Sequence, residues 1–184
     1  APEMTWVKRR DSATNWRGNV AALGTNGQDS PVLKLNSDGA SEDDNGSYFG
    51  NNNSGGYTAP TSSVLTLGGH GDVNASGGTY MAYLFATVAG VSKVGSVSHT
   101  SGSSTNVDCG FSSGAKFVII KRSDGVSDWR VYDTARGIVS GNDPYLQLNE
   151  DDAETSGDFI DPLNSGFTMT DNYDSGTYIF YAVA

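Results

Sequence analysis

Histidines, the single cysteine and the carboxylates are the side chains that could do covalent chemistry in this sequence. A hydrolytic triad needs a histidine beside a serine or cysteine nucleophile. The chain has two histidines, His70 and His99, and one cysteine, Cys109. Both histidines lie in Gly/Ser-rich segments without the strand-to-helix context of a nucleophile elbow. We therefore expect both to be solvated loop residues and predict no catalytic residue.

Paired carboxylates could instead hydrolyse a glycosidic bond. Acidic residues are abundant, but only four of the 21 are glutamates. Three of these, Glu42, Glu150 and Glu154, fall in segments expected to be surface loops. A polysaccharide depolymerase is thus a third alternative behind two non-enzymatic functions.

Two acidic loops at equivalent places offer oxygen ligands at close spacing. Calcium binds six to eight oxygens from Asp, Asn, Glu, carbonyls and water. Neither loop fits the EF-hand pattern, and the alternative is a solvated acidic turn. Calcium is the one cofactor that the sequence suggests, and its candidate ligands are Asn36, Asp38, Glu42, Asn149, Asp151 and Glu154.

Aromatic residues beside arginines are the candidates for ligand binding. An exposed Trp could stack on a sugar ring while an adjacent Arg bonds the hydroxyls; the alternative for each Trp is a core anchor, because aromatic side chains bury large areas. Tyrosines in a Gly/Asn loop resemble the composition of binding loops, and the alternative there is a plain surface excursion. The candidates are Trp16, Arg17, Trp129, Arg130, Tyr48 and Tyr57.

Composition restricts the class of protein that must position these residues. The 184 residues correspond to one domain or two small ones. A formal charge of −10 and a pI near 4.3 argue against nucleic-acid binding, which requires cations. No apolar run approaches the length of a membrane span, and one cysteine excludes an intramolecular disulfide framework. The 24 glycines and the excess of Asp over Glu favour turns over helix.

The chain contains an internal duplication. Shifted by 113 positions, residues 3–43 match residues 116–156 at 13 of 41 positions, including Trp16/Trp129 and Arg17/Arg130. A shift of 98 aligns NASGGTYMAY (74–83) with NYDSGTYIFY (172–181). The difference of 15 residues falls opposite a low-complexity tract at 44–60, which is predicted to be a long surface loop.

Each repeat therefore predicts the same series of strands. We expect an all-β fold, a two-sheet sandwich of jelly-roll or lectin-like type with internal pseudo-twofold duplication. The first unit would span 1–90 and the second 91–184; we expect one shared sandwich, with two packed modules as the alternative. The apolar runs 80–88 and 178–183 predict central strands. The first unit has no counterpart of 91–110, which favours a shared core or a partner that completes its sheet.

The second unit resembles a repeat found in large structural proteins of marine bacteriophages, cyanophages among them. The resemblance rests on VIIKRSDGVSDWRVYDTARG (118–137), FIDPLNSGFTM (159–169) and SGTYIFYAVA (175–184), with the upstream segment 88–111. The first unit departs from it, since Asn19 stands opposite Tyr132 and a long insertion follows. Members are placed with tail fibres or other virion appendages, and no catalytic residue carries over.

Two non-enzymatic functions follow from the resemblance. The first is a virion surface or appendage domain that binds a host surface glycan or receptor. The second is a purely structural module, a capsid decoration or fibre part, contacting only virion proteins or its own copies, with a trimer as one form. Both imply location on the virion, and neither involves nucleic acid or membrane insertion.

Overall fold

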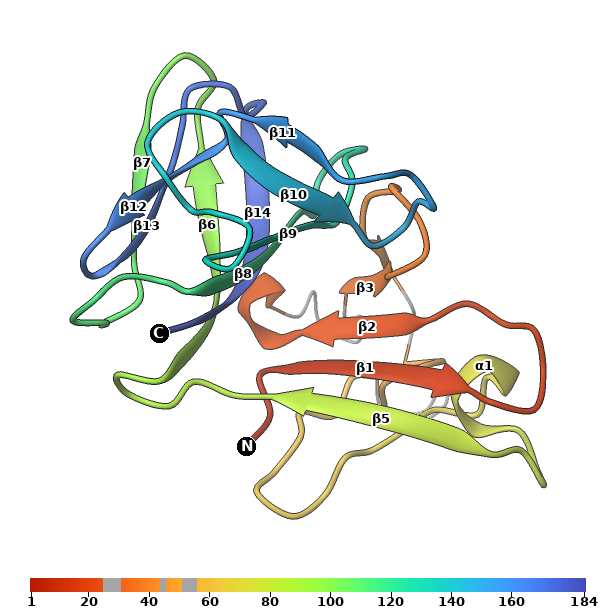
Figure 1. Cartoon of the computed structure of the whole chain (residues 1–184). Coiled ribbons are helices and arrows are strands. Elements are labelled where there is room, and N and C mark those ends of the chain that lie inside the picture. The colour runs from red at the N-terminus through yellow and green to blue at the C-terminus, as the bar shows by residue number, and fades with distance from the viewer. Residues whose placement is uncertain (25–30, 44–45, 51–55) are drawn as a thin grey trace. The chain divides into compact units, whose positions relative to one another are not determined.

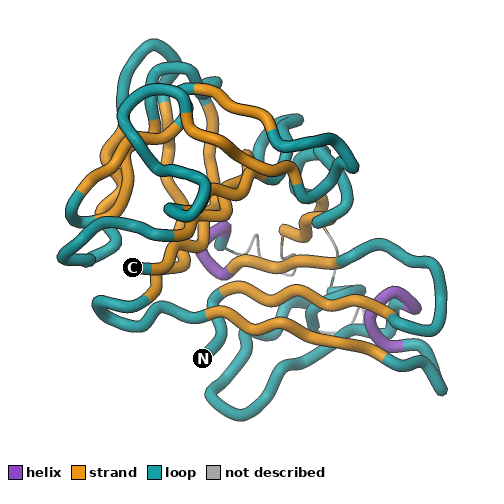
Figure 2. Tube along the Cα trace, in the orientation of Figure 1, coloured by secondary structure: helices purple, strands orange, loops and turns teal. Residues whose placement is uncertain are grey.

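The computed structural model describes all residues except 25–30, 44–45 and 51–55. The described chain is nearly all strand, which confirms the predicted all-β class (Figures 1 and 2). It divides into two compact units, Ala1–Ala86 and Thr87–Ala184. The sequence placed this boundary at 90/91, four residues later, and the single sandwich shared by both units stays a prediction.

Unit 1 is built on one antiparallel five-stranded sheet with the order β4-β3-β2-β1-β5. The sheet is accompanied by a 3-10 turn and one four-residue helix, whose first turn is capped by the ring nitrogen of His70. The elements are β1 (Met4–Arg9), β2 (Arg17–Val20), η1 (Ala21–Leu23), β3 (Pro31–Lys34), β4 (Glu42–Asp43), α1 (Gly71–Asn74) and β5 (Tyr80–Phe85).

Unit 2 contains two antiparallel sheets. The larger has the order β11-β10-β9-β8-β14-β6, and the smaller has the order β12-β13-β7. The elements are β6 (Ser92–His99), β7 (Thr105–Asp108), β8 (Phe117–Arg122), β9 (Arg130–Asp133), β10 (Asp143–Gln147), β11 (Thr155–Gly157), β12 (Ile160–Leu163), β13 (Gly166–Met169) and β14 (Gly176–Val183).

The core of unit 2 lies between its two sheets. Phe180 of the large sheet and Phe167 of the small sheet meet edge to face, with ring centroids 5.5 Å apart. Tyr132, Ile120 and Met169 belong to the same buried cluster. Unit 2 is therefore a two-sheet β-sandwich.

Unit 1 buries its sheet under loops instead. Val7 and Val32 of the sheet pack with Phe49 and Val73, which come from the connection between β4 and β5. Residues 62–71, which the shift of 98 places opposite β12 and β13, form no strand. In the described residues, unit 1 has no second sheet.

The structure confirms the duplication strand by strand. β1 to β4 correspond in order to β8 to β11 under the shift of 113, and β5 corresponds to β14 under the shift of 98. The registers agree residue by residue: Met4↔Val20 repeats as Phe117↔Asp133, and Lys8↔Met81 repeats as Lys121↔Ile179. Register is fixed by which face is buried, so both copies keep one ancestral strand order. The pseudo-twofold relation between them stays a prediction.

The expectation for residues 80–88 was wrong. β14 is a central strand, with β8 on one side and β6 on the other. Its twin β5 is the last strand of its sheet, and four of its six residues are exposed (Figure 1). An apolar run becomes buried only when neighbouring strands cover it, and the part of unit 1 that the structure describes has no strand in the place of β6.

Candidate functional site

Two aromatic rings of unit 1, Trp16 directly before β2 and Tyr83 in β5, meet at a partly exposed surface of the sheet. The rings of Trp16 and Tyr83 lie 6.0 Å apart and are tilted by 32°. Tyr83 is 42% exposed, Trp16 is partly exposed, and Met81, two residues along β5, is also 42% exposed. We call Trp16, Tyr83 and Met81 the aromatic platform.

The main chain at Trp16 is held by the first of the two acidic loops. The Trp16 N–H donates to Oδ1 of Asn36 at 2.9 Å, and the Asn36 amide donates to Oδ1 of Asn15 at 3.0 Å. A side-chain amide that accepts from one segment and donates to another fixes both against each other. Trp16 thus enters β2 in one orientation.

The same hydrogen bond between an Asn side chain and a Trp main-chain N–H recurs in unit 2, but there the Trp is buried. The Trp129 N–H donates to Oδ1 of Asn149 at 2.8 Å, and the Asn149 amide donates to Asp128. Trp129, however, is only 1% exposed, so it is a core residue, the alternative that the sequence left open. Only the first Trp of the repeated pair is accessible to a ligand.

Arg17 points away from the platform into an ion-paired cluster. Its Nε donates to Oδ2 of Asp72 at 2.8 Å, and one terminal nitrogen lies 3.6 Å from Glu42. Its guanidinium also lies 4.1 Å over the ring of Tyr48. With 6% of its surface exposed, Arg17 is neutralised internally and does not reach a sugar stacked on Trp16.

Arg130 occupies the equivalent position among aromatic rings. Its guanidinium lies 3.9 Å over Phe159 and 5.4 Å from the rings of Tyr145 and Tyr173. No carboxylate forms an ion pair with it within the described part of unit 2. Burial lowers the pKa of Arg130, but the surrounding tyrosines outweigh that effect and the net pKa is raised. The arrangement stabilises the charge through ring faces and joins two strands, β9 and β10, to the loops that carry Phe159 and Tyr173.

Tyr48 and Tyr57 lie on the core side of the long loop. Tyr48 stacks on His70 with centroids 4.5 Å apart. The Tyr57 hydroxyl donates to Asn19 at 3.2 Å, and burial raises the pKa of Tyr57. Both rings pack on the unit 1 core, so they support the loop here, although 44–45 and 51–55 of the predicted loop lie outside the described residues.

The candidate calcium ligands are mostly engaged in other bonds. Asn36 and Asn149 accept main-chain N–H groups as described above. Glu42 forms ion pairs with Lys34 and Arg17, and Glu154 forms one with Arg136 at 2.8 Å. Asp38 and Asp151 are exposed. Within the described ranges, no three His, Cys, Asp or Glu side chains gather as a metal site, and calcium binding stays a prediction.

Neither histidine is hydrogen-bonded to a serine or cysteine side chain in the described structure. The Nδ1 of His70 accepts the Asp72 N–H at 3.1 Å as a helix cap. His99 was expected to be a solvated loop residue, and that was wrong: it ends β6, is buried, and contacts Thr105 Oγ1 at 3.0 Å. Burial lowers the pKa of His99. Cys109 is buried too, and burial raises its pKa to about 12.

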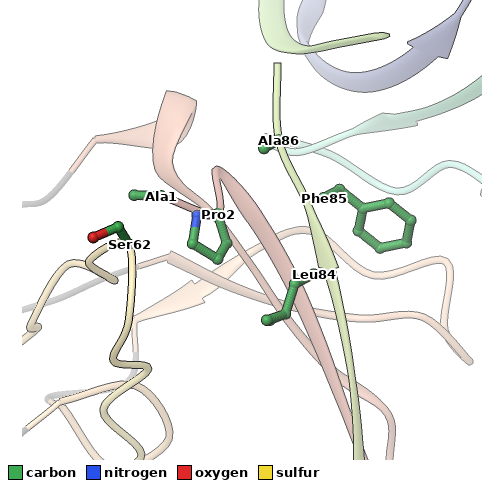
Figure 3. A pocket seen from close by; sticks show the side chains of 6 residues that line it. All are labelled: Ala1, Pro2, Ser62, Leu84, Phe85 and Ala86. Atoms are coloured by element: carbon green, nitrogen blue, oxygen red, sulfur yellow. The ribbon is translucent and has the colours of Figure 1, made fainter. Parts of the chain in front are cut away.

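A small hollow lies beside the end of β5. It measures about 240 Å³ and contains one side-chain hydroxyl, that of Ser62, and no ionisable side chain (Figure 3). Leu84 and Phe85 leave the strand on opposite sides there. The remaining lining residues are Ala1, Pro2 and Ala86. The hollow offers packing surface without catalytic groups.

Sequence reasoning missed Tyr83 and Met81. The alignment of 74–83 with 172–181 already paired Tyr83 with Tyr181, so the aromatic type was visible. The exposure of Tyr83 and Met81 could not be read from the sequence, because it depends on whether another strand lies beside β5. The missing counterpart of 91–110 was the signal that could have revealed it.

The sequence matches a protein family over residues 1–184, and the family is described as a domain of unknown function, DUF7483. The chain belongs to the DUF7483 family. Neither the curated proteins nor the solved structures give a match to this DUF7483 chain. No helix in the described part of the DUF7483 chain has the length and apolar character to cross a membrane.

Proposed function

We propose that the chain is a non-enzymatic surface or appendage domain of a phage virion that binds a host surface glycan on the aromatic platform. The observation that carries the proposal is the pair of rings of Trp16, partly exposed before β2, and Tyr83, exposed in β5, with centroids 6.0 Å apart. Aromatic rings give large apolar contact with little loss of conformational freedom. They suit the C–H faces of pyranose rings.

The scaffold supports this use of the platform. Trp16 is held by the Asn36 hydrogen bond and Tyr83 by the β1–β5 ladder, so neither ring needs to be ordered when a ligand binds. A site on rigid strands keeps its geometry better than one on a mobile loop. The virion context rests on the resemblance to marine phage repeats, and the glycan is the class of host receptor that fits a stacking surface.

The test is glycan binding by matched variants of Tyr83. Tyr83→Ser removes the ring, whereas Tyr83→Phe keeps the ring and removes only the hydroxyl. On a host glycan identified by array, we expect Tyr83→Ser to weaken binding about tenfold, or about 1.4 kcal/mol, and Tyr83→Phe to bind as the parent does. Leu148→Ser, at an exposed apolar site of unit 2, is the control for general loss of surface hydrophobicity. Equal binding by Tyr83→Ser and the parent would refute the platform.

A second candidate function is the purely structural virion module. The open edge of β5 favours it, since exposed strand edges are where sheets associate. A chain that binds no host glycan but assembles on particles stripped of it would favour this function. Release of reducing ends from host polysaccharide would instead indicate the depolymerase.

A further inference from the structure

We propose that β5 is a self-association edge, on which a second copy of this chain adds its own β5 in antiparallel register. The proposal goes beyond glycan binding and does not depend on it. β14, the counterpart of β5 in unit 2, is paired on the side that β5 leaves open.

The main chain of β14 bonds to neighbours on both sides. Ser123 N–H donates to Thr177 C=O, and Ala184 N–H donates to Val91 C=O. Since bonded pairs alternate along an antiparallel ladder, residues 178, 180 and 182 direct their N–H and C=O groups to β6. Eight residues of β14 are paired with β6 in this way.

The equivalent groups of β5 face away from its sheet. Arg10 N–H donates to Thr79 C=O, so the same alternation leaves Tyr80, Ala82 and Leu84 with their main-chain groups directed to the open side. The ladder with β1 is continuous over six pairs, without a bulge. An edge of this kind is a template for another strand.

Charge does not oppose a second copy at this strand. The chain carries −10, so two copies repel each other over most of their surfaces. Residues 73–92 contain no Asp, Glu, Lys, Arg or His, which makes β5 the centre of a neutral stretch of twenty residues. None of the charge, proline or bulge devices that usually protect an edge is present. Within the chain, β6 is already bonded to β14, so another molecule must supply the strand.

One register satisfies all the outward groups. Pairing Ala82 with Ala82 of the second copy joins Tyr80 to Leu84 and Met81 to Tyr83 across the twofold axis. The main-chain groups of all three outward residues are then bonded. On one face Met81 and Tyr83, each 42% exposed, then lie opposite each other, and on the other face Leu84, 52% exposed, lies opposite Tyr80.

Opposite charges at the central position test the pairing. We expect the parent to show a concentration-dependent monomer–dimer equilibrium in sedimentation velocity. Ala82→Lys and Ala82→Glu each place like charges directly opposite and should weaken the homodimer about fivefold. An equimolar mixture should restore a heterodimer. Val126→Lys, at an exposed turn of unit 2, should dimerise as the parent does.

Two further measurements keep the proposal falsifiable if a charged variant folds poorly. Ala82→Cys should form a disulfide-linked dimer, because Cα atoms of a bonded antiparallel pair are about 5.5 Å apart, within disulfide range. The buried Cys109 does not compete, and Val126→Cys gives the background of collisional cross-linking. Ala82→Pro removes an N–H that faces the open edge and not β1, and should weaken dimerisation about thirtyfold.

A parent that stays monomeric at every concentration, or dimers that Ala82→Pro leaves unchanged, would overturn the proposal. A synthetic peptide of residues 92–99 that binds a monomeric chain would overturn it as well, since the edge would then take a foreign strand. Glycan binding by the Tyr83 variants is measured separately at concentrations that favour monomer. Failure of either idea therefore leaves the other standing.

Discussion

Asp143 makes stability depend on pH in a direction that the structure predicts. The residue begins β10, and none of its surface is exposed. One carboxyl oxygen accepts the Val139 N–H at 2.7 Å, whereas Oδ2 is buried without a hydrogen-bond partner. Burial, and to a smaller degree the charges of Asp161 and Asp158, raise the pKa of Asp143 from 3.8 to about 6.

The direction in which the Asp143 contribution to stability changes with pH follows from the linkage between protonation and folding. The folded pKa lies above the unfolded value, so between pH 4 and 6 the folded state binds more protons than the unfolded chain. The contribution of Asp143 to the free energy of unfolding therefore falls as pH rises through this interval and is level above it. A shift of about two units corresponds to roughly 3 kcal/mol lost at neutral pH.

Asp143→Asn removes the ionisation and keeps the acceptor for Val139. We expect the variant to be more stable than the parent at pH 7.5 by about 2 to 3 kcal/mol, and the two to converge near pH 4. Urea unfolding of the full chain at half-unit steps from pH 4 to 8 measures both curves. Asp124→Asn is the control, because the pKa of Asp124 is lowered and its contribution is lost towards acid pH instead. A stability difference that does not change with pH would refute the reasoning.

Three further predictions concern other buried or paired groups. Asp72→Asn leaves the charge of Arg17 buried and should lower the free energy of unfolding by about 3 kcal/mol, whereas Asp124→Asn, in an exposed pair, should cost less than about 1 kcal/mol at neutral pH; chemical denaturation checks both. Asn149→Ala removes the acceptor of the N–H that precedes β9 and should cost about 1 to 3 kcal/mol, seen as a lower urea midpoint with an unchanged m-value. Cys109, with its pKa near 12, should react with a thiol reagent at pH 8 only after denaturant is added.

The sequence predicted the all-β class, the repeated series of strands and the first hairpin of each unit because the duplication could be read directly. Two aligned copies with conserved turn residues, such as Arg9-x-Asp11 and Arg122-x-Asp124, require the same hairpin. The structure repeats that contact at 2.8 Å in both copies. In both repeats an Asn follows the Trp by 20 residues, and the structure shows a hydrogen bond between them. The sequence analysis assigned these Asn residues to calcium instead.

The partners of the repeated arginines could not be predicted. Arg17 and Arg130 occupy the same register position, opposite Lys34 and Gln147. One is neutralised by Asp72, which lies 55 residues away, and the other stacks on Phe159. Sequence spacing carries no information on such long-range contacts, and the twin copies show that one backbone accepts either solution.

The contrast between β5 and β14 shows how a duplicated unit acquires a surface. The two strands have similar apolar sequences, and on one side each pairs with an equivalent strand, β5 with β1 and β14 with β8. β14 gains β6 beside it and the small sheet over Phe180, so its apolar side chains become core. Among the described residues of unit 1, β5 has neither neighbour, and the same pattern becomes exposed surface. Burying it on a second copy would place Met81 of one molecule beside Tyr83 of the other and lengthen each aromatic platform. A dimer that binds long glycan chains more tightly than the Ala82→Pro monomer, with equal affinity for a single sugar, is the result expected if assembly and recognition share this strand.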